Sequence, residues 1–328
     1  MATTTTALKG AGPVTGSRSF FVKLRDGDEI ARLVTFLFAA TVVLITILLV
    51  WELWVNSVLP RHKFGLHFFV TQTWDPIVDE FGALPFIYGT VVTSALSLLI
   101  AIPLGIGAAI FLAELAPAPV SDTLQFFIDL LAAVPSVIYG LLGVFIVVPL
   151  VRTVIFPALN KPFGFLPIFR GPSYGVGFIT AGIVMAIMVI PYIISVSREV
   201  LLSVPRDQRE AALALGSTRW ESTWKVVVPF AKTGIMGSIF LALARALGET
   251  MAVTMVIGNT PKIAASLFAP GYSIAAVIAN EFTEATGDLY LQALIELGLV
   301  LFLLTFILNG LARLLIVVTT QKGSGVAA

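Results

Sequence analysis

Residues 203–229 read SVPRDQREAALALGSTRWESTWKVVVP, a polar segment set between long apolar runs. The helix formers in QREAALAL are followed by Gly216, a typical residue just past a helix end. Thr218 and Glu221 have the spacing of a capping box, in which each side chain bonds the backbone N–H of the other residue. The segment therefore predicts two short helices joined by a glycine turn, the second of them running to Pro229 at the membrane.

The composition around this segment is that of a membrane protein. Apolar residues make up 58% of the 328 residues and charged residues 12%, whereas a soluble domain has about 25% charged residues. The formal net charge of +1 offers no broad basic surface for nucleic acid. The chain has no cysteine, which excludes disulfides, thiolate metal sites and cysteine nucleophiles, and its two histidines argue against a histidine-based metal or catalytic cluster.

Six apolar stretches reach the roughly 20 residues that a spanning helix needs. We therefore predict an all-α polytopic membrane protein with six transmembrane helices. The stretches are 33–51, 86–113, 130–151, 171–197, 233–257 and 289–312.

The distribution of lysine and arginine predicts the orientation of these helices. If six spans are threaded, thirteen such residues lie on the side of both termini and six on the opposite side. Cytoplasmic segments carry the excess of positive charge, so both termini and residues 203–229 are expected in the cytoplasm. The loop 114–129 falls on the same side although its only charges are Glu114, Asp122 and Asp129, because acidic residues contribute little to the rule.

Three roles are open for the segment 203–229. A helix–turn–helix DNA reader would have to lie flat against the membrane, tethered at both ends and without a free dimer partner. A connector that packs on its own bundle is the simplest structural explanation. A docking element for a cytoplasmic partner also fits, because the alanines at 211, 212 and 214 would let a backbone approach closely.

A longer pattern favours the docking role. Glu210-Ala211-Ala212, three residues, Gly216, nine residues and then Val226-Val227-Val228-Pro229 resemble the EAA loop of ABC importer permeases. The pattern of that family is EAA, three residues, Gly, nine residues and Ile-x-Leu-Pro, so here valine replaces isoleucine and leucine. The resemblance implies the type I ABC importer permease fold. It also implies that Glu210, Ala211, Ala212 and Gly216 couple the permease to a cytoplasmic ATP-binding subunit.

Three further stretches resemble the phosphate permeases of the same family. They are ALARALGETMAV at 242–253, AAVPSVIYGLLG at 132–143 and IANEF at 278–282. The resemblance implies a phosphate importer with a sister permease subunit, a cytoplasmic ATP-binding subunit dimer and an external phosphate-binding protein. This chain lacks the G-x-x-x-x-G-K-[ST] loop that cradles phosphates of ATP. We therefore expect ATP and Mg²⁺ to be used by the partner, and no catalytic residue, cofactor or metal in this chain.

Four regions of a multi-pass protein of the cell (inner) membrane follow from the spans and the resemblance. They are a cytoplasmic N-terminal tail at 1–30, the first transmembrane helix with an external loop at 31–85, a five-helix importer core at 86–318 that contains the coupling loop 198–232, and a cytoplasmic C-terminal tail at 319–328.

Arg245 and Glu249 are the only charged residues between Thr233 and Ile257. In a continuous helix over this stretch, Arg245 would lie roughly 18 Å from each end, at mid-depth in a bilayer. An arginine there costs about 2.5–3.5 kcal/mol on insertion scales and usually faces a bundle interior or a water-filled path. An ion pair with Glu249 at i+4 contributes only ~0.2–0.5 kcal/mol on an isolated helix, and here it has the less favoured order. This mismatch favours a functional role for the arginine.

Arginine suits a tetrahedral oxyanion, because its planar fork donates two parallel hydrogen bonds and stays charged. With the resemblance to phosphate importers, this predicts that Arg245 meets phosphate as it leaves the external binding protein. Glu249 would hold the arginine in the resting state and repel the dianion enough to prevent trapping. Thr250, Thr254 and Asn259 are candidates for lining the outer part of the path, although hydroxyls in membrane helices more often bond their own backbone.

Other functions are compatible with parts of the sequence. The same machine could carry another oxyanion, such as molybdate or sulfate. A proton-driven secondary transporter could use Glu249 and Glu296 as relay groups, but it leaves the EAA pattern unexplained. Glu296 is otherwise expected to be a helix–helix hydrogen-bonding residue. An intramembrane enzyme would need a nucleophile–base or metal constellation at membrane depth, and the sequence offers none.

Overall fold

The computed structural model describes residues 28–172 and 174–321. The predicted tails at 1–30 and 319–328 therefore lie almost entirely outside the described residues. The chain divides into two compact units, 1–52 and 53–328.

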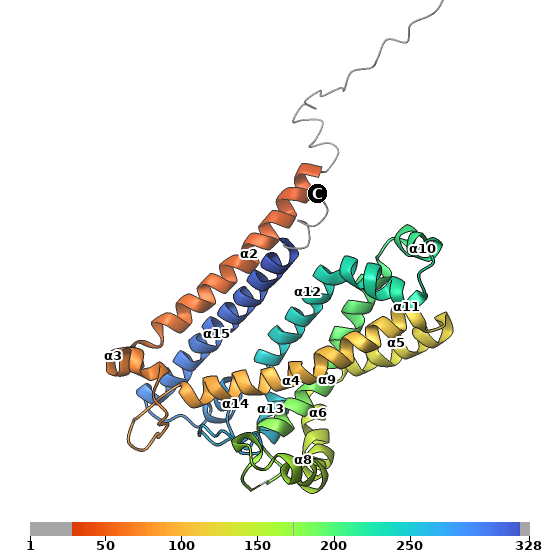
Figure 1. Cartoon of the computed structure of the whole chain (residues 1–328). Coiled ribbons are helices and arrows are strands. Elements are labelled where there is room, and N and C mark those ends of the chain that lie inside the picture. The colour runs from red at the N-terminus through yellow and green to blue at the C-terminus, as the bar shows by residue number, and fades with distance from the viewer. Residues whose placement is uncertain (1–27, 173, 322–328) are drawn as a thin grey trace, which may run out of the picture. The chain divides into compact units, whose positions relative to one another are not determined.

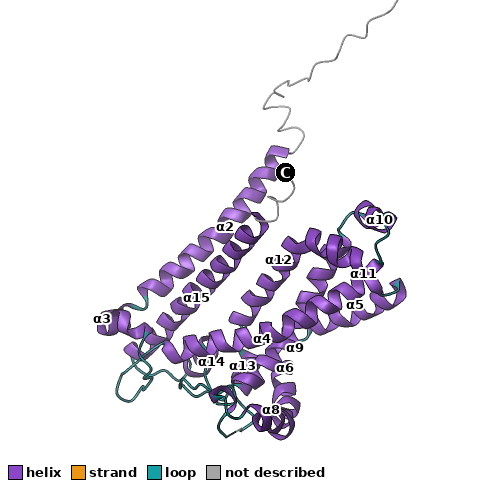
Figure 2. Ribbon diagram, viewed as in Figure 1, coloured by secondary structure: helices purple, strands orange, loops and turns teal. Residues whose placement is uncertain are grey.

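Helices make up nearly all regular structure in the described part of the chain (Figure 2), together with one isolated bridge between Asp75 and Glu80. Six helical segments are long and apolar enough to cross a membrane, which confirms the predicted number. They are Ile30–Val55, Leu84–Leu115, Ser136–Phe163, Phe178–Leu202, Arg219–Leu247 and Asp288–Leu314.

The described part of the first unit is most of helix α2 (Asp28–Val55). Large apolar side chains on every face of this helix are exposed within the chain, among them Leu33, Phe36, Leu37 and Phe38. A helix that is apolar all round needs an apolar solvent. This is the behaviour expected of a transmembrane helix surrounded by lipid or by a partner.

The centre of the second unit is formed by α4 (Leu84–Ile110) and α9 (Phe178–Leu202) (Figure 1). A Cβ on Gly182 would lie 2.7 Å from Leu96 Cβ, so only a glycine lets the two helices approach this closely. Helix α12 (Val228–Leu247) joins α9 through a buried hydrogen bond of 2.8 Å between Ser197 and Ser238. Small and hydroxyl residues therefore hold this bundle together, as is usual between membrane helices.

The third membrane crossing differs from its prediction. Helix α5 (Ala118–Ala133) occupies most of the predicted loop 114–129, and the predicted span 130–151 is interrupted before α6 (Ser136–Leu142). Val134 is extended, as the residue before Pro135 tends to be, and the helix stops there. The crossing continues through η3 (Gly143–Val147), α7 (Val148–Leu150), η4 (Val151–Ile155) and α8 (Phe156–Phe163).

The polar residues of α5 are the reason that hydropathy alone placed this helix in a loop. Ser121 and Asp122 contact Arg198 of α9, with Nη2 at 3.1 Å from Ser121 Oγ and 3.3 Å from Asp122 Oδ1. Two turns further along α5, Asp129 Oδ1 accepts from Ser195 Oγ at 2.9 Å. The polar stripe thus faces α9, while the opposite side is apolar and exposed, including Leu124, Phe126, Phe127, Leu130 and Leu131.

The fourth and last spans are shifted from their predicted bounds. Residues 171, 172 and 174–177 are not helical, and α9 begins at Phe178 after Gly177, whose φ is +153°. The last helix, α15, runs from Asp288 to Gln321. Short helices lie in the connections between the spans: α3 (Val58–Phe64), η1 (Gly65–Phe69), η5 (Pro167–Phe169) and α14 (Ile274–Glu281).

The predicted glycine turn and capping box in 203–229 are confirmed. Helix α10 (Arg206–Ala214) is followed by Gly216 at φ +87°, and the Thr218–Glu221 capping box opens α11 (Arg219–Ser222). The predicted end at Pro229 is wrong, because α11 continues through η6 (Thr223–Val227) into α12 (Val228–Leu247). The wide π-helical turn of η6 ends two residues before the proline, and such turns are one way for a helix to accommodate a residue that lacks an N–H.

An aromatic cluster lies where the segment after α3 meets α14 and the start of α15. Trp74 packs edge-on against Phe81 and Phe86, and Phe81 stacks on Tyr290 at 5.4 Å between ring centroids. Glu281 joins the cluster by accepting from Trp74 Nε1 at 2.8 Å and from Tyr290 Oη at 2.7 Å. The IANEF stretch therefore anchors the segment after α3, for which the sequence predicted only an external loop.

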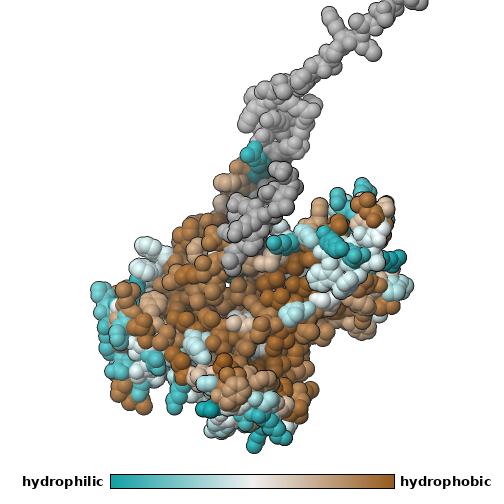
Figure 3. Space-filling view, in the orientation of Figure 1, coloured by the Kyte–Doolittle hydropathy of each residue, from teal (hydrophilic) through white to brown (hydrophobic). Residues whose placement is uncertain are grey.

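Polar surface in the second unit collects at two ends of the bundle. Figure 3 shows hydrophilic residues around α10 and α11 and around α3 and α8, with mainly apolar residues between them on the face in view. This banding matches a bundle whose middle lies in lipid.

Candidate functional site

The predicted continuous helix over 233–257 is interrupted. Helix α12 ends at Leu247, where the Gly248 N–H bonds the Ala244 carbonyl at 3.4 Å, and α13 (Met251–Val256) starts afresh. Arg245 therefore lies in the last turn of α12 and not halfway along a helix. The depth argument from helix length is wrong, and a cation in this last turn is instead favoured by the helix dipole by about 0.3–1 kcal/mol.

The Arg245 guanidinium packs on an aromatic ring. Its Cζ lies 4.2 Å from the ring centroid of Tyr192 on α9. The Nε atom is buried and unpartnered, and no residue in the described part of the chain forms a hydrogen bond or ion pair with this side chain. A buried donor without an acceptor carries a desolvation cost of about 1–3 kcal/mol or more when it is charged. The guanidinium thus has hydrogen-bonding capacity that a bound anion could use.

Glu249 does not pair with Arg245 in this structure. No ion pair of 4.0 Å or less joins the two among the residues described. Its Oε1 instead accepts the Ala252 N–H at 3.1 Å, which satisfies one of the free donors at the start of α13. The expectation that Glu249 holds the arginine is therefore wrong for this conformation, because the helix break leaves Glu249 between α12 and α13, where it bonds the first turn of α13.

The three predicted path residues bond their own backbone. Thr254 Oγ1 donates to the Thr250 carbonyl at 2.7 Å, and Thr250 Oγ1 donates to the Gly248 carbonyl at 3.3 Å. Asn259 is exposed, adopts a φ of +47°, and donates from Nδ2 to the Thr254 carbonyl at 3.0 Å. Their place in a path stays a prediction.

Tyr192 connects the arginine to the break between α5 and α6, and Tyr139 bonds the same end of α5. Tyr192 Oη donates to the Ala132 carbonyl at 2.9 Å, and Tyr139 Oη donates to the Leu131 carbonyl at 2.6 Å. Both hydroxyls thereby satisfy carbonyls at the end of α5 that the broken helix leaves free. Sequence reasoning missed Tyr192, and its only signal was an aromatic residue beside Pro191 in an aliphatic span.

Gly140 explains why α13 can pack on α6. A Cβ at this position would lie 2.5 Å from Met255 Sδ and 3.2 Å from Ala252 Cα. The break after Arg245 and the break before α6 are therefore held against each other by a glycine contact.

The predicted coupling residues form a surface at the far end of α12 from Arg245 (Figure 1). Glu210, Ala211 and Gly216 are exposed, whereas Ala212 is buried against the chain's own bundle. Leu215 at the tip is 88% exposed. Docking of this surface on another subunit stays a prediction.

Arg209 fixes α10 to the ends of two long helices. Its Nη1 and Nη2 donate to the Val204 and Leu201 carbonyls at 2.6 and 2.7 Å, at the end of α9. Nη2 also bonds Glu114 Oε1 at 2.9 Å, in η2 (Phe111–Leu115) at the end of α4. The Glu114 side chain is only 10% exposed. This clamp was missed because its members lie 95 positions apart in sequence.

Comparison with known proteins identifies one transport family and relatives that share one name. Residues 101–316 match the family described as "Binding-protein-dependent transport system inner membrane component". The "Phosphate transport system permease protein PstC" of Haemophilus influenzae is 43% identical over 92% of this chain and 97% of its own length. The protein of the same name from Pasteurella multocida is 50% identical over 79% of this chain and 82% of its own.

Solved structures agree on the fold. A chain of a bacterial alginate ABC transporter, solved with an alginate-bound periplasmic protein, superposes with a TM-score of 0.55 at 16% identity and covers 90% of this chain and 96% of its own. A chain of the inward-facing MetNI methionine ABC transporter gives a TM-score of 0.51 at 17% identity, over 74% and 98%. With a family match over residues 101–316 and relatives of this similarity, the chain belongs to the binding-protein-dependent transport system inner membrane components, among the phosphate transport system permease proteins PstC.

Proposed function

We propose that this chain forms half of the translocation path of an ATP-driven importer of inorganic phosphate, and that Arg245 is the residue that meets the anion. Phosphate as the substrate is supported by the name that the two relatives share, which describes a phosphate transport system. The observation that carries the role of Arg245 is its guanidinium, which lies over Tyr192 with a buried Nε that lacks an acceptor. A phosphate oxygen would supply that acceptor, and the helix break beside it leaves the chain free to reshape around the anion.

The partners follow from the family. As an ABC transporter permease, the chain is a multi-pass inner membrane transport subunit that works with an ATPase and a binding protein and is not itself catalytic. More specifically, we propose a sister permease that completes the path, an ATP-binding subunit dimer on the α10 surface and an external phosphate-binding protein at the opposite end. This arrangement places α10 and both termini in the cytoplasm, in line with the excess of lysine and arginine there.

A mechanical route connects the two ends. Closure of the ATPase dimer would push on Glu210, Ala211 and Gly216. The Arg209 clamp would pass that movement to α9 and α4. Helix α9 also carries Tyr192, so its displacement would move the ring beneath Arg245. The guanidinium would thereby exchange an outward-facing position for an inward-facing one.

Transport by vesicles that contain the assembled transporter tests the function. Uptake of radiolabelled phosphate should require ATP at the α10 side, persist when the proton gradient is collapsed, and be unchanged by equimolar sulfate or molybdate. Equal competition by sulfate or molybdate would instead identify an importer of another oxyanion. Loss of uptake with the proton gradient would identify a secondary transporter.

A further inference from the structure

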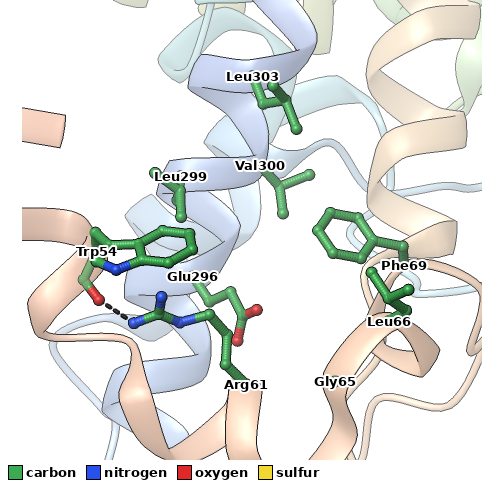
Figure 4. Close-up of a pocket in the computed structure, with 9 residues that line it drawn as sticks. All are labelled: Trp54, Arg61, Gly65, Leu66, Phe69, Glu296, Leu299, Val300 and Leu303. Atoms are coloured by element: carbon green, nitrogen blue, oxygen red, sulfur yellow. Dashed lines mark hydrogen bonds between the residues drawn. The ribbon is translucent and has the colours of Figure 1, made fainter. Parts of the chain in front are cut away.

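A groove between α3, η1 and α15 lies away from the proposed phosphate path. It has a volume of about 420 Å³, and its walls are apolar side chains that include Leu66, Phe69, Leu299 and Leu303. Figure 4 shows two charged residues at one end of it, Arg61 and Glu296, with Leu303 at the other end. All of these residues belong to the second unit. We call this site the α3–α15 groove.

Glu296 is a carboxyl group without a partner. The residue is 2% exposed, and its Oε2 is buried with no hydrogen-bond partner. No ion pair of 4.0 Å or less joins it to Arg61 among the residues described. The predicted helix–helix hydrogen bond is therefore wrong. Because buried polar groups are almost always hydrogen-bonded, this carboxyl oxygen requires a donor from outside the chain.

Arg61 is held in place but keeps donor capacity. Its Nε donates to the Ser57 carbonyl at 3.0 Å, its Nη2 donates to the Trp54 carbonyl, and Cζ lies 3.8 Å from the Trp54 ring centroid. Nη1 forms no hydrogen bond within the described part of the chain. Tryptophans and arginines with this arrangement are typical of the membrane interface, where lipid headgroups lie. A rigid guanidinium with an open donor is suited to a phosphate group.

We propose that the α3–α15 groove binds a phospholipid with a phosphate and a primary ammonium in its headgroup, of the phosphatidylethanolamine class. The phosphate bonds Arg61, the ammonium donates to Glu296, and an acyl chain lies along Leu299 and Leu303. This ligand supplies both the anion and the N–H donor that the two side chains require. Phosphatidylglycerol has no cation for Glu296, and the quaternary ammonium of phosphatidylcholine has no N–H.

Native mass spectrometry of the intact, detergent-purified transporter tests this. Dioleoyl phosphatidylethanolamine should be retained about tenfold better than dioleoyl phosphatidylglycerol or phosphatidylcholine, the scale expected for one charge-assisted hydrogen bond. Glu296→Gln should remove the preference, since its amide does not attract an ammonium. Leu303→Trp should displace the lipid by filling the groove without changing either charge.

The matched control is Leu311→Trp, an equally apolar change at an exposed position of the same helix. It should leave retention as in the unmodified transporter. Equal retention of all three lipids, or ethanolamine-lipid retention unchanged by Leu303→Trp, overturns the proposal. Because Leu303→Trp keeps both charged residues, it gives a result even if Glu296→Gln fails to assemble.

Discussion

Arg245→Gln should abolish ATP-driven phosphate uptake while leaving the transporter assembled. Hydrogen bonds to charged groups contribute about 1.5–3 kcal/mol each, so losing a two-pronged contact with phosphate corresponds to an uptake rate on the order of 10²–10⁴-fold lower. Folding should change little, because Arg245 forms no hydrogen bond or ion pair with a described residue. Its packing on Tyr192 is a cation–π contact of about 0.5–2 kcal/mol. Radiolabelled uptake and size-exclusion chromatography of the assembled complex measure the two effects separately.

Lys232→Gln is the control for charge. Lys232 is an exposed cation nearer the start of the same long helix, so this variant should take up phosphate at the normal rate. The uptake rate of Arg245→Lys should lie between those of Arg245→Gln and Lys232→Gln, since lysine keeps the charge and loses the planar fork. Normal uptake by Arg245→Gln would contradict a role for the guanidinium in transport.

Glu114→Gln should loosen the coupling helix α10 from α4. Removing one member of a buried ion pair costs about 3–5 kcal/mol, and the Glu114–Arg209 pair is nearly buried, with side chains 10% and 21% exposed. The equilibrium between docked and undocked α10 should shift roughly 10²–10⁴-fold. Hydrogen exchange of the amides in 206–214 should accelerate by that factor, and phosphate uptake should fall relative to ATP hydrolysis.

Asp122→Asn provides the comparison. Asp122 also pairs with an arginine, Arg198, but its side chain is 76% exposed. Exposed pairs of this kind contribute about 0–1 kcal/mol. Exchange in α10 and the ratio of uptake to hydrolysis should stay unchanged in this variant. If Glu114→Gln behaves in the same way, α10 is not held through Arg209 and the proposed mechanical route fails.

The number of spans and the coupling motif were predictable because each depends on local sequence. Apolar runs of about 20 residues give six spans, and the Thr218–Glu221 capping box and Gly216 turn act within a few residues. The predicted helix bounds were wrong where contacts between distant parts of the chain determine them. Helix α5 was placed in a loop because its polar stripe, which faces Arg198 and Ser195, lowers its hydropathy.

The candidate site was only half predictable. Arg245 was identified as a charge in an apolar run, but the helix break at Gly248 was not predicted. Because of this break, Glu249 bonds the Ala252 N–H and does not form the assumed pair with Arg245. A glycine within an apolar run ends a helix only when the residues that follow it pack against another element. Here the residues of α13 pack on Gly140 of α6. Tyr192 and the Glu114–Arg209 clamp depend on contacts between distant parts of the chain, which a single sequence does not contain.

Thiol accessibility at position 245 tests the central claim most directly. The chain has no cysteine, so Arg245→Cys introduces a single thiol into this subunit. If the side chain at 245 faces an aqueous path, a membrane-impermeant cationic thiol reagent should modify it in the assembled transporter, at a rate that changes when ATP is hydrolysed. Ser238→Cys is a near-isosteric change at a fully buried position of the same helix and should stay unmodified. If the thiol at 245 is as unreactive as the one at 238 in both resting and cycling transporter, no anion passes that position.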